Sequence, residues 1–135
     1  MYKHILLAVD GSASSARAIE AAAALPNSGS EILVLHIREI EVTRGEHAKE
    51  DPDHAVHLVD QVVADLRGRG LTVTGEAKNA TAGQVAPSIL AAAKEFNADV
   101  IVMGTRGLSD FAALLVGSVA HKVINHADCA VLITR

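Results

Sequence analysis

A glycine pattern between Gly104 and Ser118 is the part of this 135-residue chain whose residue types and spacing could do chemistry. Gly104 and Gly107 are followed, after nine residues, by Gly117 and Ser118, and an apolar run over 100–103 precedes them. Glycines at a strand end let backbone N–H groups approach a ligand, and a following helix start favours an anion. Arg106 adds a forked, permanently charged donor. The spacing predicts a site for a phosphorylated ligand, with ordinary tight turns as the alternative.

Asp10 is a second candidate, because it follows another short apolar run, 5–9. A carboxylate at a strand tip can accept hydrogen bonds from ribose hydroxyls or help to hold a phosphate-bound metal. It can equally support the start of the next helix, for which Ser12 or Ser14 is the expected N-cap. Ribose contact and helix capping both stay open.

The histidines and the cysteine give weaker signals. His54 and His57 lie three residues apart on an expected helix, with His47 nearby, which could place two imidazoles on one face. No cysteine or close carboxylate set completes a metal site, so a solvated face is favoured. His36 is interpreted as a packed or edge histidine, and Cys129 as an unreactive thiol.

Known catalytic patterns are missing from the sequence. There is no Gly-x-Ser-x-Gly elbow, no Walker lysine after a glycine loop and no Gly-x-Gly-x-x-Gly. Nothing supplies a clear general base for a γ-phosphate. The sequence therefore indicates binding rather than turnover. The apolar side chains within 108–116 suggest a lid or a partner surface, with plain packing as the alternative.

The elements that must position these residues alternate along the chain. The expected strands are 5–9, 32–37, 71–77 (edge-like), 99–103 and 130–134, and the expected helices are 13–25, 53–69, 83–96 (capped by Thr81) and 117–126. Polar residues over 38–52 predict a long mobile loop. The alternation predicts a parallel sheet with helices on both faces and a ligand at the carboxyl ends of the strands.

Composition limits the class of protein. The length predicts one domain over 1–135, and 50% hydrophobic with 2% aromatic residues predicts a core of Ala, Val, Ile and Leu. The net charge of −4 and the lack of a basic run argue against nucleic acid as a partner. No apolar stretch approaches the ~20 residues that span a bilayer. With one cysteine and no signal-peptide pattern, the sequence predicts a cytoplasmic protein.

The chain resembles a universal stress protein over nearly its whole length. The resemblance rests on the opening 5–12, the segment 99–107, the helix start 117–119 and the ending 127–133. The nucleotide-binding branch of that family carries G-x2-G-x9-G-[S/T], and the chain carries this pattern in full.

The resemblance implies a fold and a function. The fold would be a Rossmann-like, single-domain, three-layer α/β sandwich: a five-stranded parallel sheet of order 3-2-1-4-5 with four helices. The ligand would be ATP, AMP or another adenine nucleotide, including a cyclic one, with Mg²⁺ carried by the phosphates. The protein would be a stress-response or signalling module and a homodimer through the last strand, 130–134. The alternatives are a partner-binding module that uses no nucleotide and a slow ATP hydrolase. Residues 10–15 lack the Ser-Gly-Gly-x-Asp-Ser loop of ATP-cleaving relatives, which argues against the hydrolase.

The resemblance also assigns roles residue by residue. Ala8 would line the adenine pocket, Asp10 would contact the ribose or phosphates, and Ile37 would offer backbone groups to the adenine edge. The remaining residues would line the nucleoside or hold the phosphates: Met103, Gly104, Thr105, Arg106, Gly107, Gly117, Ser118 and Val119. Ala8 and Ala130 stand where the family often has proline, which should affect pocket rigidity and assembly geometry respectively.

Overall fold

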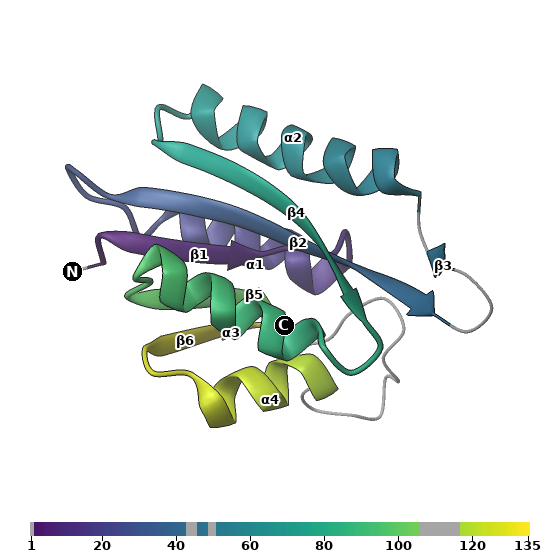
Figure 1. The fold of residues 1–135 in the computed structure, drawn as a ribbon. Helices are drawn as coiled ribbons and strands as arrows, with labels where there is room; N and C mark the ends of the chain where they lie inside the picture. The colour runs from purple at the N-terminus through teal and green to yellow at the C-terminus, as the bar shows by residue number, and fades with distance from the viewer. Residues whose placement is uncertain (1, 43–45, 49–50, 106–116) are drawn as a thin grey trace.

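The fold is a parallel sheet between two layers of helices (Figure 1). The computed structural model describes residues 2–42, 46–48, 51–105 and 117–135. Its elements are β1 (His4–Ala8), α1 (Ala13–Ala23), β2 (Glu31–Val42), β3 (Glu46–Ala48), α2 (Pro52–Gly68), β4 (Val73–Thr81), α3 (Val85–Phe96), β5 (Val100–Gly104), α4 (Ser118–His126) and β6 (Ala130–Thr134).

The five parallel strands lie in the order β4-β2-β1-β5-β6, with β3 antiparallel to the end of β2. Numbered without β3, this is the expected order 3-2-1-4-5, and the expectation of four helices is also confirmed. The third expected strand does lie at an edge of the sheet, as β4. The reversal of strand order on the two sides of β1 places the tips of β1 and β5 side by side.

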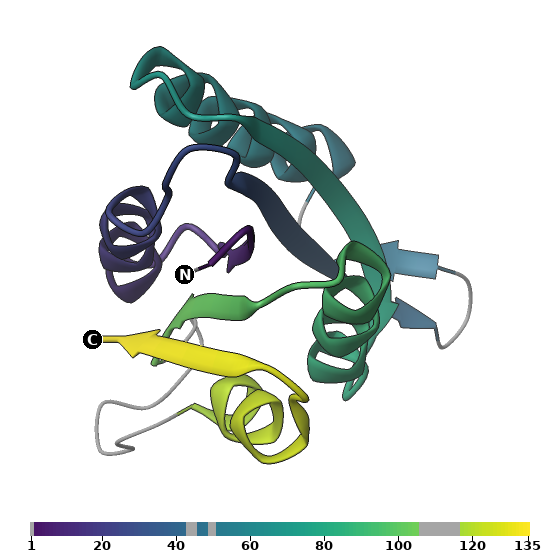
Figure 2. The same ribbon diagram turned by 90° about the vertical axis from the view of Figure 1, so that its left-hand side faces the viewer.

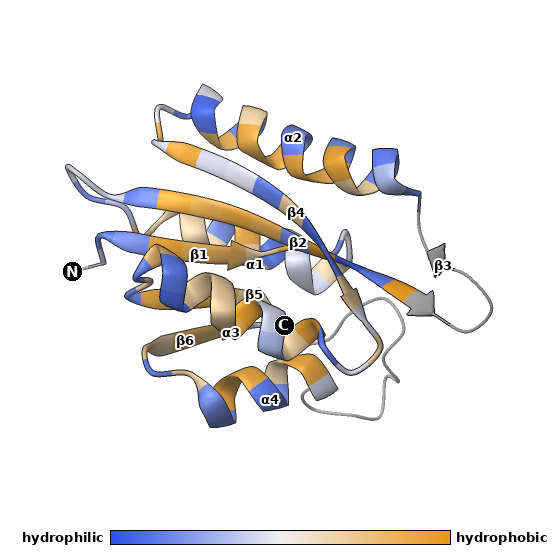
Figure 3. Cartoon of the chain, in the orientation of Figure 1, coloured by the Kyte–Doolittle hydropathy of each residue, from blue (hydrophilic) through white to orange (hydrophobic). Residues whose placement is uncertain are grey.

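The central strands β1 and β5 and the first half of β2 bury both of their faces, which explains their continuous apolar runs, whereas β4 and β6 are more exposed. Ile5, Leu7 and Val34 pack in one cluster with α1 and α2, whereas Leu6, Leu35 and Ile101 pack in a second cluster with α3 and α4. Figure 2 shows the two helix layers on opposite sides of the sheet. Figure 3 shows apolar residues along β1 and much of β2 and on the sheet-facing side of α2. Among the described residues, no helix is both long enough and apolar enough to cross a membrane.

Glycine at position 75 allows α2 to lie directly on β4. A Cβ at Gly75 would lie 2.5 Å from Val59 Cγ1 and 2.7 Å from Val63 Cγ2. Because real Cβ atoms do not approach so closely, a larger residue there would push the helix away from the strand.

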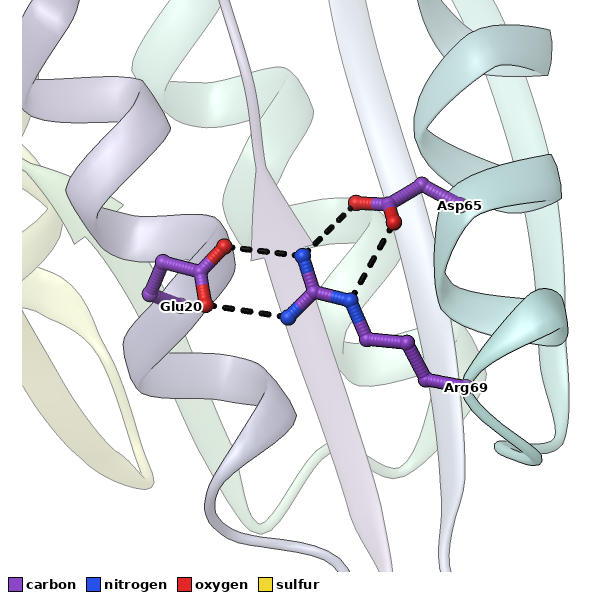
Figure 4. A network of polar contacts seen from close by, with 3 residues as sticks. All are labelled: Glu20, Asp65 and Arg69. Carbon is purple, nitrogen blue, oxygen red and sulfur yellow. Dashed lines mark hydrogen bonds and ion pairs between the residues drawn. The ribbon is translucent and has the colours of Figure 1, made fainter.

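The C-terminal end of α2 is tied to α1 by three charged side chains (Figure 4). Arg69 donates two hydrogen bonds to Glu20 at 2.8 and 2.9 Å, and two more to Asp65 at 2.9 and 3.1 Å. These bonds lower the pKa of Glu20 and raise that of Arg69. The network joins the two helices that cover the same face of the sheet.

Several expected boundaries were wrong. The stretch 38–52 is not one loop, because β2 continues to Val42, β3 follows, and α2 begins at Pro52. Backbone pairing with β4, for example Arg38 with Asn79, makes the strand despite its polar residues. The strand expected at 71–77 is β4, which begins later and continues to Thr81.

The expected cap of the third helix was also wrong. Thr81 ends β4, and α3 begins at Val85 after Gln84, which makes no side-chain capping bond. The expectation of Ser12 as the cap of α1 is confirmed, because its side chain accepts from the Ser15 N–H.

Candidate functional site

The tip of β1 holds Asp10 in a hydrogen-bonded turn. One carboxylate oxygen, Oδ1, accepts from the Ser12 N–H at 2.8 Å, and the Asp10 N–H donates to Ser15 Oγ at 3.1 Å. Gly11, between them, has a φ of 84°, a left-handed conformation that glycine adopts without strain. The structure therefore shows the helix-start role of Asp10, and its contact with a ribose stays a prediction.

The tip of β5 packs against the first turn of α1. A Cβ at Gly104 would lie 2.8 Å from both the carbonyl carbon and the Cβ of Ser14. The Thr134 hydroxyl, at the end of β6, donates to the Ser14 carbonyl at 2.9 Å. The absence of a side chain at Gly104 is thus required for β5, β6 and α1 to meet at this edge.

Thr105 connects the two ends of the glycine pattern. It is buried, its N–H donates to the Thr134 carbonyl at 2.6 Å, and its carbonyl accepts from the Gly117 N–H at 2.5 Å. These bonds place the start of α4 next to the tip of β5. Gly104, Thr105 and Gly117, which the sequence grouped by spacing, are therefore brought together. Arg106, Gly107 and the apolar segment 108–116 lie outside the described residues.

The first turn of α4 offers backbone donors at this place. Gly117 is its N-cap in an extended conformation, and the first intrahelical bond runs from the His121 N–H to the Gly117 carbonyl at 2.9 Å. The N–H groups of the first helical residues, Ser118 and Val119, have no partner inside the helix. Since Gly117 gives its own N–H to Thr105, an anion here would be held by Ser118 and Val119. The exposed Ser118 hydroxyl is a further donor.

The remaining predicted residues lie on one face of the sheet. Ile37 and Met103 are buried in the cluster beneath α3 and α4, and Ala8 packs against the same cluster. Ala8 ends β1 and Met103 is the penultimate residue of β5, whereas Ile37 lies within β2, two residues beyond Leu35, which pairs with Ala8. The three residues therefore lie near the carboxyl ends of β1 and β5.

The backbone of Ile37 is directed toward the end of β1. The Leu35 carbonyl accepts from the Val9 N–H at 2.9 Å, whereas the Ile32 N–H donates to Thr72, before β4. Because backbone polar groups alternate in direction along a strand, those of Ile37 point to the β1 side, as those of Leu35 do. The β1 strand ends at Ala8, so they face the space beyond its tip.

Outside the candidate site, the pKa values of Asp99 and Cys129 are shifted by their structural surroundings. The pKa of Asp99 is lowered because its carboxylate accepts from the N–H groups of His4 and Lys3 at 2.9 and 2.7 Å. Burial, aided by Asp128 and Asp99, raises the pKa of Cys129. A raised pKa makes the Cys129 thiol a poorer nucleophile.

The rest of the described chain offers no competing site. A cavity of about 350 Å³ lies between the C-terminal ends of α3 and α4, at the opposite end of the sheet from the strand tips. Its lining includes Ile101, Asp128 and Cys129. Within the described ranges, no group of three or more His, Cys, Asp or Glu side chains could hold a metal. His54 and His57 are exposed on α2.

Sequence reasoning missed the residues that close the site. Ser14 and Thr134 are 120 positions apart in the sequence, and no local sequence pattern predicts the hydrogen bond between them. His36 is buried, and its Nδ1 lies 2.7 Å from the Val9 carbonyl, immediately before Asp10. The expectation of a packed or edge histidine at position 36 is therefore confirmed as a packed one, whereas its bond to Val9 was not predicted.

Comparison with known proteins gives one consistent family. The sequence profile of the universal stress protein family matches residues 1–135. The chain is 33% identical to the universal stress protein YxiE of Bacillus subtilis and 36% identical to a universal stress protein of Thermus aquaticus, encoded in the QAH/OAS sulfhydrylase 3′ region. Both alignments cover 100% of each chain.

Solved structures share the fold. A universal stress protein of Archaeoglobus fulgidus in complex with dAMP has a TM-score of 0.75 at 24% identity, covering 99% of this chain and 98% of its own. A universal stress protein in complex with cAMP has a TM-score of 0.70 at 21% identity, covering 99% and 97%. A family member from Arabidopsis thaliana with AMP bound has a TM-score of 0.69 at 22% identity, covering 98% and 90%.

Proposed function

This chain belongs to the universal stress protein family, and from that premise we propose that it binds an adenine nucleotide and acts as a nucleotide-dependent regulatory module. The single observation that carries the proposal is the hydrogen bond between Thr105 and Gly117. It sets the N-terminus of α4 beside the tip of β5, at the edge where Asp10 and Ile37 also lie. Structures of family members with cAMP, dAMP and AMP support an adenine nucleotide as the ligand class.

The proposed roles follow from these positions. Adenine would lie over the α3 side of the strand tips, against Ala8 and Met103, with its polar edge at the Ile37 backbone. Asp10 would accept from the ribose hydroxyls. The phosphates would bind the N–H groups of Ser118 and Val119 and the Ser118 hydroxyl, because unpaired amides and the helix dipole favour negative charge there.

The proposal extends to the parts of the site that lie outside the described residues. Arg106 and Gly107 would complete the phosphate contacts, and Mg²⁺ would be held mainly by the phosphates of bound ATP. The bound state would be what a regulatory partner recognises, with at most slow hydrolysis. Location in the cytoplasm and lack of nucleic-acid binding remain part of this proposal.

Thermal unfolding with nucleotides tests the proposal. A ligand that binds only the folded state stabilises it by an amount that grows with the logarithm of its concentration once that concentration exceeds Kd. We expect melting temperature to rise with Mg-ATP, AMP or cAMP at millimolar concentration, and to rise less with adenosine, which lacks phosphate. No rise with any of these ligands, for protein that unfolds cooperatively, would reject nucleotide binding.

A second candidate, a dimeric module that works through protein contacts, is favoured by the exposed edge of β6. This strand ends the sheet next to β5, and its Leu132 side chain is 37% exposed. An exposed apolar edge strand is a template for pairing with another chain. We propose a homodimer through Ala130–Thr134.

The dimer is tested by sedimentation of Leu132→Lys, with Val56→Lys on α2 as a matched control, since Val56 is 50% exposed on another element. A dimer that dissociates only in the Leu132 variant supports β6 pairing. A wild-type protein that sediments as a monomer at high concentration rejects it.

A further inference from the structure

His36 lies where the hydrogen-bonded ladder between β1 and β2 ends. Its side chain is buried, with 5% exposure, and its Nδ1 lies 2.7 Å from the Val9 carbonyl oxygen. Because a carbonyl oxygen only accepts, Nδ1 is the donor and carries the proton. Burying a polar side chain costs free energy unless the side chain is hydrogen-bonded, so the bond to Val9 offsets the cost of burying His36.

The Val9 carbonyl oxygen, which accepts from His36, is also the acceptor that the β1–β2 ladder would use if it continued by one more hydrogen bond. The Val9 N–H donates to the Leu35 carbonyl at 2.9 Å. In a parallel ladder that continued by one step, the Ile37 N–H would donate to the Val9 carbonyl. The imidazole donates to this oxygen and takes one of its two acceptor positions at the place where the ladder would continue.

The same bond fixes the peptide unit that carries Asp10. The carbonyl of the Val9–Asp10 peptide accepts from His36, and the N–H of that peptide donates to Ser15 Oγ at 3.1 Å. Both polar groups of one peptide plane are therefore held from opposite directions, by β2 and by α1. Since the plane is fixed, the position of the Asp10 Cα, from which the side chain leaves the backbone, is fixed as well.

We propose that His36 is a positioning residue of the nucleotide site. It orients the Val9–Asp10 peptide, and by occupying the Val9 carbonyl it keeps the Ile37 N–H directed at the adenine edge. The inference rests on the proposed function for the identity of the ligand. The hydrogen bond and its effect on the strand tip are properties of the protein without ligand.

The test compares two substitutions at this position with a control elsewhere. His36→Leu keeps an apolar side chain of similar reach but removes the donor, and His36→Asn keeps an N–H near the position of Nδ1. Ser30→Ala is the matched control, because Ser30 is also buried and donates to a backbone carbonyl, that of Tyr2, at the opposite end of β2. Titration calorimetry with AMP and with Mg-ATP measures Kd, and NMR hydrogen exchange follows the amides of Asp10 and Ser12 without ligand.

We expect His36→Leu to raise Kd for AMP about fivefold to tenfold, the effect of one lost hydrogen bond. His36→Asn should recover most of this loss, and Ser30→Ala should lower thermal stability without changing Kd. Exchange at Asp10 and Ser12 should accelerate in His36→Leu alone. A Kd unchanged in His36→Leu, no recovery in His36→Asn, or an equal rise in Ser30→Ala would overturn the inference.

Failure of the proposed function gives a different result. If the wild-type protein binds no nucleotide, the proposed function is rejected. The hydrogen-exchange measurement then decides whether His36 positions the tip of β1. Faster exchange at Asp10 and Ser12 in His36→Leu only would still support positioning of the strand tip. Unchanged exchange would overturn it.

Discussion

The carbonyl of Thr105 accepts a hydrogen bond from the N–H of Gly117 at 2.5 Å, across a chain separation of twelve residues. The same Thr105 donates to the Thr134 carbonyl at the end of β6. Two strands and a helix start are thereby fixed to one residue, so the first turn of α4 lies beside the edge of the sheet at which we propose that a phosphate binds. Thr105 and Gly117, at the two ends of the glycine pattern and twelve positions apart in the sequence, are thus neighbours in space.

Replacement of Gly104 by alanine should damage both stability and binding. The added Cβ would lie 2.8 Å from the Ser14 carbonyl carbon, so α1 must shift away from β5. Overpacking of this kind costs about 1–3 kcal/mol. Chemical unfolding measures the loss, and AMP titration should show weaker binding, because the same shift moves the turn that holds Asp10.

Gly68→Ala is the control for this substitution. Gly68 ends α2, and nothing lies within 4 Å of the position that its Cβ would take. Alanine there should leave stability unchanged or raise it. Equal stability of the Gly104 and Gly68 variants would contradict the contact between Gly104 and Ser14.

The sheet and part of the site could be predicted from the sequence because their signals are local. Continuous apolar runs mark strands buried on both faces, and Ser12 marks a helix start within three residues of its partner. The end of β2 could not be predicted, because Arg38 and Asn79 form strand pairs only once β4 lies beside β2. Non-local pairing thus outweighed polar composition there.

The contacts of individual site residues also divide into those that a local sequence pattern indicates and those that depend on the whole sheet. The glycine spacing grouped Gly104 with Gly117, and the hydrogen bond from Gly117 to Thr105 brings them together, while their binding of phosphate stays a prediction. The contacts of His36 with Val9 and of Thr134 with Ser14 depend on strand order and register. Those are set by packing of the whole sheet and leave no trace in a short window of sequence.

Stability should fall in acid through Asp99. Its pKa in the folded protein is lowered below the ordinary 3.8 by hydrogen bonds from the N–H groups of His4 and Lys3. A group with a lowered pKa stabilises the fold above its unfolded pKa, and this stabilisation is lost as pH falls through the folded value. Denaturant unfolding between about pH 6 and pH 3 should therefore show a decline to which Asp99 contributes.

Asp99→Asn isolates that contribution. Asparagine keeps an oxygen that can accept from both N–H groups but has no charge to titrate. The variant should be less stable than the wild type near neutral pH, and the difference should shrink toward pH 3. Parallel stability curves for the two proteins would show that Asp99 does not contribute to the acid dependence.

The network centred on Arg69 should be sensitive to geometry and salt. Arg69 pairs with both oxygens of Glu20, which lysine cannot reproduce with one ammonium group. Arg69→Lys should lower the melting temperature slightly, because the pair is exposed and screened by water. The difference from the wild type should diminish at 1 M salt, where the Debye length is about 3 Å. A difference that does not change with salt would assign the effect to packing of the arginine stem.

A negative charge at the start of α4 should act in opposite directions on the free protein and on the nucleotide complex. Ser118 is the exposed first residue of the helix, so Ser118→Asp can be accommodated there. An aspartate in the first turn interacts favourably with the helix dipole, by about 0.3–1 kcal/mol, so the free protein should unfold at the same or a higher temperature. The same charge would repel a phosphate held by the N–H groups of Ser118 and Val119, and Kd for ATP should rise roughly tenfold or more.

Two comparisons separate charge from shape in this experiment. Ser118→Asn has nearly the same size as the aspartate variant without its charge, so it should bind ATP more tightly than Ser118→Asp. Adenosine has no phosphate, so its Kd should be the same in both variants. If Ser118→Asp weakened ATP and adenosine equally, the phosphates would not lie at the N-terminus of α4. Because the free protein keeps its stability in either case, the result would bear on ligand placement and not on folding.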